Sequence, residues 1–182
     1  MHKKPPVIEL PPKLQGLLER ATDDGETLPM LLRRINFEQL KTGRLGLMGD
    51  ITKLADGTAE PKLVVYKDST GFNWDDRIRK DGMSGLRFVA LDETGPELNS
   101  DFNWVNVDRV RVLAMVDPDT KHMAMFDEDG DLPSNAVYGF SELKDSEEFN
   151  SKEFTIVHAQ GLDLKSIPFT FVNTQDLNSA PA

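Results

Sequence analysis

Apolar residues near the start of the chain recur at helical spacing. Residues 11–21, PPKLQGLLERA, open with two prolines, which suit the first turn of a helix. Leu14, Leu17 and Leu18 fall on one side of that helix. We therefore expect a short helix here, ended by the polar segment TDDGE.

A second helical pattern starts at Leu28. Its apolar residues follow the i, i+3, i+4, i+7 period and comprise Leu28, Leu31, Leu32 and Ile35. Thr27 is a typical N-cap residue, and Gly43 is typical of the position just past a helix end. The sequence predicts a helix between them that packs through its leucine and isoleucine side chains, with Arg33 and Arg34 on the other side.

From residue 44 onward the pattern becomes that of β-strands. The clearest is VDRVRVLAMV, residues 107–116, whose residues from Arg109 alternate between two faces, with Val110, Val112, Ala114 and Val116 on one. DPDTK then turns the chain and HMAMF returns, so residues 109–126 are predicted to form a hairpin. Further strands are predicted at residues 44–51, 61–67 (with Pro61 as boundary), 85–95, 136–140, 154–161 and 167–173.

These elements define an α+β fold, in which short N-terminal helices pack on a mainly antiparallel sheet. Strands outnumber helices, and no β-α-β alternation is present. We expect a helical segment at residues 1–43, a β-rich domain at 44–172 and a polar tail at 173–182.

Charge and composition narrow the function classes. The net charge of the chain is −10, and residues 117–153 hold eleven acidic and three basic residues, a local net charge of −8. Such a chain is not built to bind phosphate backbones, so a solvated acidic face is expected, and a DNA-mimicking surface is the alternative. The chain has no cysteine, which excludes disulfides and thiolate nucleophiles. It also lacks an apolar run long enough to span a membrane.

Two acidic segments are candidate cation sites. Asp117, Asp119 and Glu128 occupy the first, third and twelfth positions of a calcium-loop pattern, but Lys121 and His122 stand where that loop needs an oxygen ligand and a glycine. A hairpin is therefore the preferred interpretation. The cluster DEDGD, residues 127–131, is interpreted as a surface turn.

No catalytic constellation emerges from the sequence. His2 is terminal, and His122 and His158 fall in predicted strands without a motif around them. HExxH, GxSxG and Walker A patterns are absent, and the glycines of GRLGLMG do not match phosphate-binding spacing. We expect a protein that is not an enzyme and needs no cofactor.

Several blocks of the sequence, taken in order, resemble the portal-like structural proteins of tailed bacteriophages. The blocks cover nearly the whole chain: KKPPVIELPPKLQGLLERATDDGETLPMLLRRINFEQLKTGRLGLMGDI, LVVYKDSTGFNWDD, GLRFVALDE, RVRVLAM and IPFTFVNTQDL. The positions of this chain that match the signature of the family are Gly43, Arg44, Asp50, Tyr66, Asn73 and Trp74. One departure is Met48-Gly49, where the family favours a leucine–valine pair.

The resemblance implies a structural role. Proteins of this family are longer, so the chain would correspond to the outer, wing-like region of a portal or to a shortened relative. The resemblance implies a ring of subunits at one capsid vertex. DNA would pass through the ring without being bound specifically. The implied partners are other portal subunits, capsid or scaffold proteins and the terminase, and the implied location is the virion, with the host cytoplasm during assembly.

The same resemblance assigns structural roles to the FNWDD segment. It would form a bend with Trp74 buried against the sheet, Asn73 bonded to the turn backbone, and Asp75 and Asp76 facing water. Two other functions remain open. The chain could be an acidic α+β interaction module or DNA mimic that binds a basic partner, or an enzyme with a carboxylate-based site.

Overall fold

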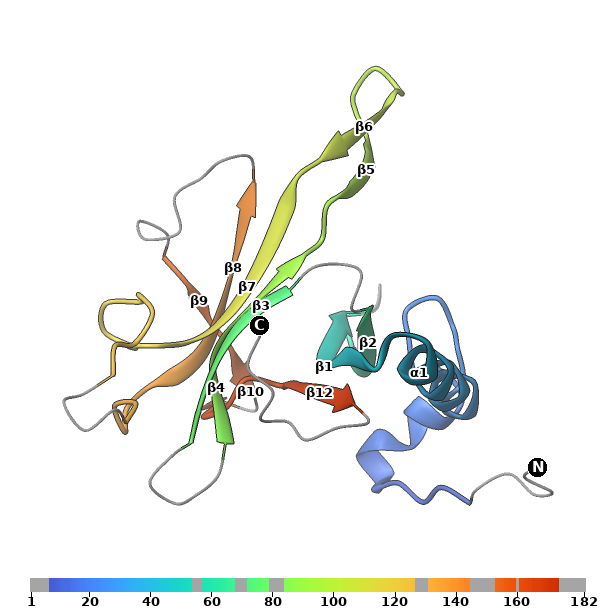
Figure 1. Cartoon of the computed structure of the whole chain (residues 1–182), viewed down its shortest axis with the longest axis horizontal. Helices are drawn as coiled ribbons and strands as arrows, with labels where there is room; N and C mark the ends of the chain where they lie inside the picture. Colours follow the sequence, from blue (N-terminus) through green and yellow to red (C-terminus); the bar gives the residue numbers. More distant parts are fainter. Residues whose placement is uncertain are drawn as a thin grey trace. The chain divides into compact units, whose positions relative to one another are not determined.

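The computed structural model describes residues 7–53, 57–67, 72–78, 84–126, 131–144, 153–159 and 161–173 (Figure 1). The chain divides into two compact units. Unit 1 combines residues 1–69 with residues 168–182, and unit 2 comprises residues 70–167. This division differs from the predicted boundaries at residues 43 and 172, because the N-terminal helices share a core with the first strands instead of standing apart.

Unit 1 is a three-stranded antiparallel sheet packed against helices. Its elements are the 3-10 helix η1 (Pro12–Leu18), the helix α1 (Leu28–Thr42), and the strands β1 (Arg44–Lys53), β2 (Ala59–Lys67) and β12 (Phe169–Asn173). The strand order is β12-β1-β2, so β1 is central. Pro61 lies within β2, opposite Ile51 near the end of β1, and does not begin the strand as predicted. A proline is tolerated there because β2 is an edge strand.

Local signals at both ends of α1 act as the sequence predicts. The Thr27 hydroxyl accepts a hydrogen bond from the Met30 amide at 3.4 Å, and Gly43 adopts a left-handed conformation with φ of 83°. Leu28, Leu31 and Ile35 are buried against Leu45 of β1. Leu32 is 36% exposed and Leu14 of η1 is 37% exposed, so neither belongs to that buried core.

Unit 2 contains a five-stranded antiparallel sheet in the order β3-β4-β7-β8-β9. Its strands are β3 (Phe72–Ile78), β4 (Ser84–Asp92), β7 (Arg109–Val116), β8 (Val137–Lys144) and β9 (Thr155–Ile156). The predicted alternation of β7 is confirmed, since one face contributes Val112, Ala114 and Val116 to a core with Val137 and Phe154. Leu113 and Met115 on the opposite face are buried as well.

The predicted hairpin at residues 109–126 is only partly correct. The chain does reverse after β7, but the return arm forms a single bridge, Val116 to Met123, and no strand. β4 pairs with residues Val110 to Ala114 of β7, so only the end of that edge of β7 is left for the return arm. β8 pairs along the other edge.

Two small antiparallel pairs complete unit 2. β5 (Gly95–Leu98) and β6 (Trp104–Val107) form a two-stranded ribbon, and β10 (His158–Ala159) pairs with β11 (Leu162–Asp163). Figure 1 shows the β5–β6 ribbon extending away from the ends of β4 and β7. Within the described part of the chain, no helix has the length and apolarity needed to cross a membrane.

Candidate interaction surfaces

Four of the predicted signature residues lie in unit 1, one at the end of α1 and three in the sheet. Gly43 ends α1, and Arg44 begins β1 opposite Asn173 of β12. Asp50 is exposed on β1, and its carboxylate accepts the Ile51 amide at 2.7 Å. Tyr66 is buried in β2 with its ring centroid 6.2 Å from that of Phe169. Each makes contacts within its own element or with a neighbouring strand, and the four residues do not converge on a shared site.

Asn73 and Trp74 lie in unit 2, on the edge strand β3. The prediction of a bend here is wrong: the segment is a strand that pairs with β4, with a bulge between Asp75 and Asp76. Asn73 Oδ1 accepts the Trp74 amide at 2.9 Å, as a local backbone contact. Trp74 is half-buried, a weaker anchor than predicted, because an edge strand has a neighbour on one side only.

The prediction for the two aspartates of FNWDD has a mixed outcome. Asp75 was expected to face water, but its carboxylate accepts a hydrogen bond from Arg87 Nε on β4 at 2.8 Å. The Arg87 guanidinium also lies 4.8 Å from the ring centroid of Phe126. Asp75 therefore links the edge strand to its neighbour. The side chain of Asp76 lies outside the described residues.

The candidate calcium loop begins with a turn closed by its own backbone. Asp117 Oδ1 accepts the amides of Asp119 at 2.8 Å and of Thr120 at 3.1 Å. That oxygen therefore stabilises the turn by hydrogen bonding, as aspartate side chains in such positions commonly do. Glu128 and residues 127–130 of the DEDGD cluster lie outside the described residues. Where the structure does describe the chain, no group of three or more histidine, aspartate or glutamate side chains is placed to hold a metal ion.

The histidines have separate environments. His122 lies in the loop after β7, so the prediction of a strand there is wrong. His158 lies in β10 as predicted, is exposed, and contacts Asp163 of β11 with 2.6 Å between Nδ1 and Oδ1. His2 lies outside the described residues.

The β5–β6 ribbon exposes large apolar side chains. Leu98 and Trp104 are directly opposite in the antiparallel register, so they share one face, and Phe102 lies in the connecting loop. Trp104 is 70% exposed and Phe102 is 83% exposed. We call these three residues the ribbon tip. Exposed apolar groups of this size, gathered on one projection, are typical of an interaction surface.

The base and loop of the ribbon are held by polar contacts. Glu97 pairs with Arg109, and Glu93 pairs with Arg111 Nε at 3.2 Å. In the loop, Asn99 Oδ1 accepts the amides of Asp101 at 3.0 Å and of Asn103 at 2.9 Å. The ribbon tip is thus carried on an ordered support.

A second exposed apolar surface lies on α1, opposite its buried side. We call it the outer helix face and define it by five residues: Met30, Arg33, Phe37, Leu40 and Lys41. All five are exposed, and their spacing places them on one side of the helix. Phe37 is 66% exposed and Leu40 is 85% exposed.

Sequence reasoning missed both surfaces, although signals for them exist. In NSDFNWVNV, three asparagines, a serine and one aspartate are interspersed among the apolar residues, so the pattern is more typical of a loop than of a strand. On α1, Phe37 and Leu40 fall outside the buried stripe of Leu28, Leu31 and Ile35, and periodicity alone predicts only that stripe. An aromatic or leucine residue on the polar side of a predicted helix is the signal that indicates such a surface.

Comparison with protein-family models and with curated proteins finds no match.

Proposed function

We propose that this chain is a structural, non-enzymatic protein that acts through contacts between protein surfaces, and that it corresponds to the wing region of a phage portal. The observation that carries the assembly role is the presence of two exposed apolar surfaces, the ribbon tip and the outer helix face, on ordered elements. A protein with such surfaces is suited to association with other proteins.

The position of the family-like blocks supports the more specific part of the proposal. The blocks fall on the helices η1 and α1, on all three strands of the unit 1 sheet, and on β3, β4 and β7 of the five-stranded sheet of unit 2. The other two strands of that sheet, β8 and β9, and the ribbon strands β5 and β6 lie outside the blocks. The resemblance therefore covers unit 1 more completely than unit 2.

Electron microscopy of the product of the complete reading frame that encodes this chain tests the portal assignment. We expect rings with a central channel, formed without nucleotide. A uniform population of small particles without a channel would contradict the assignment. Detection of terminase and capsid genes beside the reading frame would be a further, independent indication in its favour.

The acidic character of unit 2 favours a second candidate, an interaction module or DNA mimic that binds a basic partner. Residues 92–108 contain five acidic residues and no basic one. However, Glu93 and Glu97 are paired with arginines, which removes two of these charges from the exposed array. A DNA-binding basic protein that binds the chain, and is displaced from it by duplex DNA, would support this candidate over the portal.

A further inference from the structure

The ribbon tip cannot be covered by the ribbon itself. A two-stranded ribbon has no second layer, and its residues Leu98 and Trp104 point to the same exposed face. Phe102 adopts a positive φ of 59°, a left-handed conformation that is unfavourable for a residue other than glycine. The ribbon thus holds an aromatic side chain outward in a backbone conformation in which glycine would be less strained.

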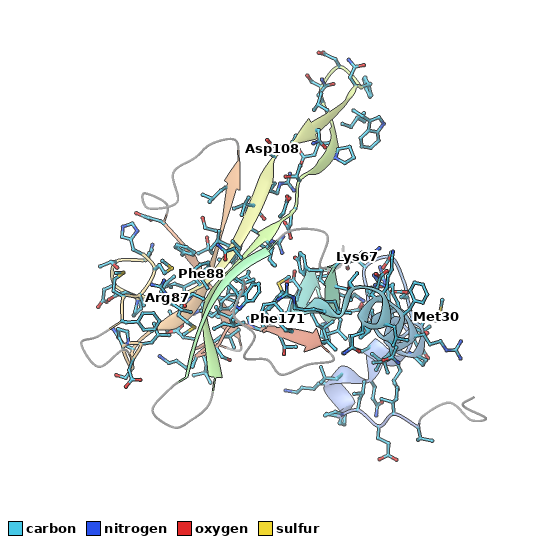
Figure 2. All side chains as sticks on the ribbon, in the orientation of Figure 1. Met30, Lys67, Arg87, Phe88, Asp108 and Phe171 are labelled. Atoms are coloured by element: carbon cyan, nitrogen blue, oxygen red, sulfur yellow. The ribbon has the colours of Figure 1, made fainter. Side chains whose placement is uncertain are left out.

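An exposed acidic residue lies at each end of the ribbon. Asp101 lies in the loop next to Phe102, and Asp108 lies just past the end of β6, where Figure 2 labels it. Both are exposed, and neither forms an ion pair with any described residue. A partner laid along the ribbon should therefore be apolar beside the ribbon tip and basic near both ends of the ribbon.

The outer helix face has these complementary properties. Met30, Phe37 and Leu40 supply the apolar groups, and Arg33 and Lys41 supply positive charge on the same side of α1. In the described part of the chain neither cation has an ion-pair partner. The acid of the helix, Glu38, is on the buried side, so no exposed acid lies on this face.

The two surfaces also agree in length. Residues 30–41 of a helix cover about 17 Å at 1.5 Å per residue. Four-residue strands cover about 13 Å, to which the loop of the ribbon adds a few ångströms. A ribbon laid along α1 can therefore place its apolar residues beside those of the helix and its two aspartates near the two cations.

We propose that the ribbon tip of one copy of this chain docks on the outer helix face of a second copy. Because the two surfaces differ, the contact is head-to-tail, and repetition gives a ring or an open chain of copies. This inference rests on the proposed assembly function, for which it supplies the contact surface. The contact is small, so we expect association of the isolated chain to be weak and to depend on protein concentration.

Charge reversal on each surface separately tests the proposal. We take Asp101→Lys with Asp108→Lys as the ribbon variant, and Arg33→Glu with Lys41→Glu as the helix variant. In either variant alone the two surfaces carry like charges, so we expect association at least about tenfold weaker than that of the wild-type chain. An equimolar mixture of the two variants restores opposite charges at every contact, and association should return.

Sedimentation velocity over a wide range of protein concentration, at low salt, measures the effect. Leu162→Ser is the matched control, because Leu162 is 73% exposed and lies outside both surfaces. It should associate like the wild type. Circular dichroism of each variant verifies that the fold is retained, and Phe102→Gly provides an uncharged second variant that should also weaken association.

Several outcomes would overturn the inference. These are a wild-type chain that stays monomeric at every concentration, a mixture that fails to recover association, or a loss of association in only one of the two variants while the other associates like the wild type. Loss in one variant alone would indicate ribbon-to-ribbon or helix-to-helix contact instead. The portal assignment fails separately: if the complete reading frame forms no ring while the mixture of variants still recovers association, only that assignment is contradicted.

Discussion

The lack of a side chain at Gly46 allows Tyr66 and Phe169 to pack together on the sheet of unit 1. Gly46 is paired with Tyr66 on one side and Phe171 on the other, and the Phe169 ring lies over it. A Cβ at this position would lie 2.8 Å from Cε2 of Phe169, well inside normal contact. The backbone conformation of Gly46 does not require glycine, because other residues can adopt it. Glycine is needed here because a side chain would collide with the Phe169 ring.

Gly46→Ala should therefore destabilise the protein by about 1–3 kcal/mol, as overpacking of a core does. Urea unfolding measures the change. Gly49→Ala is the control in the same strand, because its nearest neighbour would be the Pro168 carbonyl oxygen at an ordinary 3.9 Å. Equal stability of the two variants would contradict the role of the Phe169 ring, and Phe169→Leu should recover part of the loss in the Gly46→Ala background.

Asp24 gives a pH dependence at the residue scale. The Thr22 hydroxyl donates to Asp24 Oδ1 at 2.5 Å, and this bond, with the backbone amide of Asp24 next in importance, lowers the pKa of the Asp24 carboxyl. A carboxyl with a lowered pKa in the folded state stabilises the fold above its unfolded pKa of about 3.9. That contribution is lost as pH falls through the lowered value.

Thr22→Val removes the hydroxyl and should show this linkage. The wild type should exceed the variant in stability at neutral pH, and the difference should shrink as pH falls below about 4. A constant part will remain, because the Thr22 hydroxyl also accepts the Glu26 amide at 3.1 Å. Thr22→Ser keeps the donor and should retain the acid dependence. Unfolding curves at a series of pH values make the comparison, and parallel curves for wild type and Thr22→Val would refute it.

At the scale of elements, helix ends and strand faces were predictable from sequence because they depend on local signals. Thr27 and Gly43 bound α1 through backbone geometry that needs no tertiary partner. The alternating faces of β7 follow from its valines and alanine, which pack in a core. The signal failed for β5 and β6, whose apolar residues meet no core, and for the return arm after β7, whose edge is already taken by β4.

The ribbon should open more readily than the sheet that carries it. Its loop depends on Asn99, whose side-chain oxygen accepts two backbone amides. Asn99→Ala removes both bonds, at about 0.5–1.5 kcal/mol each. Hydrogen exchange should become faster at the amides of β5 and β6 and stay unchanged in β8. Ser100→Ala, an exposed change in the same loop, is the control. Faster exchange throughout unit 2 would mean that the ribbon opens together with the sheet.

At the scale of the whole molecule, the two units have separate cores. Leu31 and Leu45 are fully buried in the core of unit 1, whereas Val112 and Val116 belong to that of unit 2. The sequence predicted the α+β class and the antiparallel pairing, but not this division. Periodicity reports which face of an element is buried, and it carries no information on which distant strand covers it. The pairing of β12 with β1 is the contact that sequence reasoning lacked.

Because of this separation, a core defect should stay within its unit. Leu31→Ala leaves a cavity that typically costs about 2–5 kcal/mol, and we expect faster amide exchange in β1 and β2 with little change in β7. Val112→Ala should have the reciprocal effect. Leu40→Ala, at an exposed position of the same helix, should alter neither. If Leu31→Ala accelerated exchange equally in both units, they would unfold as one cooperative body.

The discontinuous make-up of unit 1 has a consequence for the order of events on the ribosome. Residues 7–67 emerge before unit 2, yet their sheet is completed only when β12, Phe169–Asn173, leaves the exit tunnel. Until then the nascent chain presents one edge of β1 without its partner, and the packing of Phe169 over Gly46 does not exist. Unit 2 is continuous in sequence and is available to fold during that interval. Within this chain, unit 1 therefore begins to be translated before unit 2 but is completed after it, and translation that stops before residue 169 would release a chain with an open strand edge, a known route to aggregation.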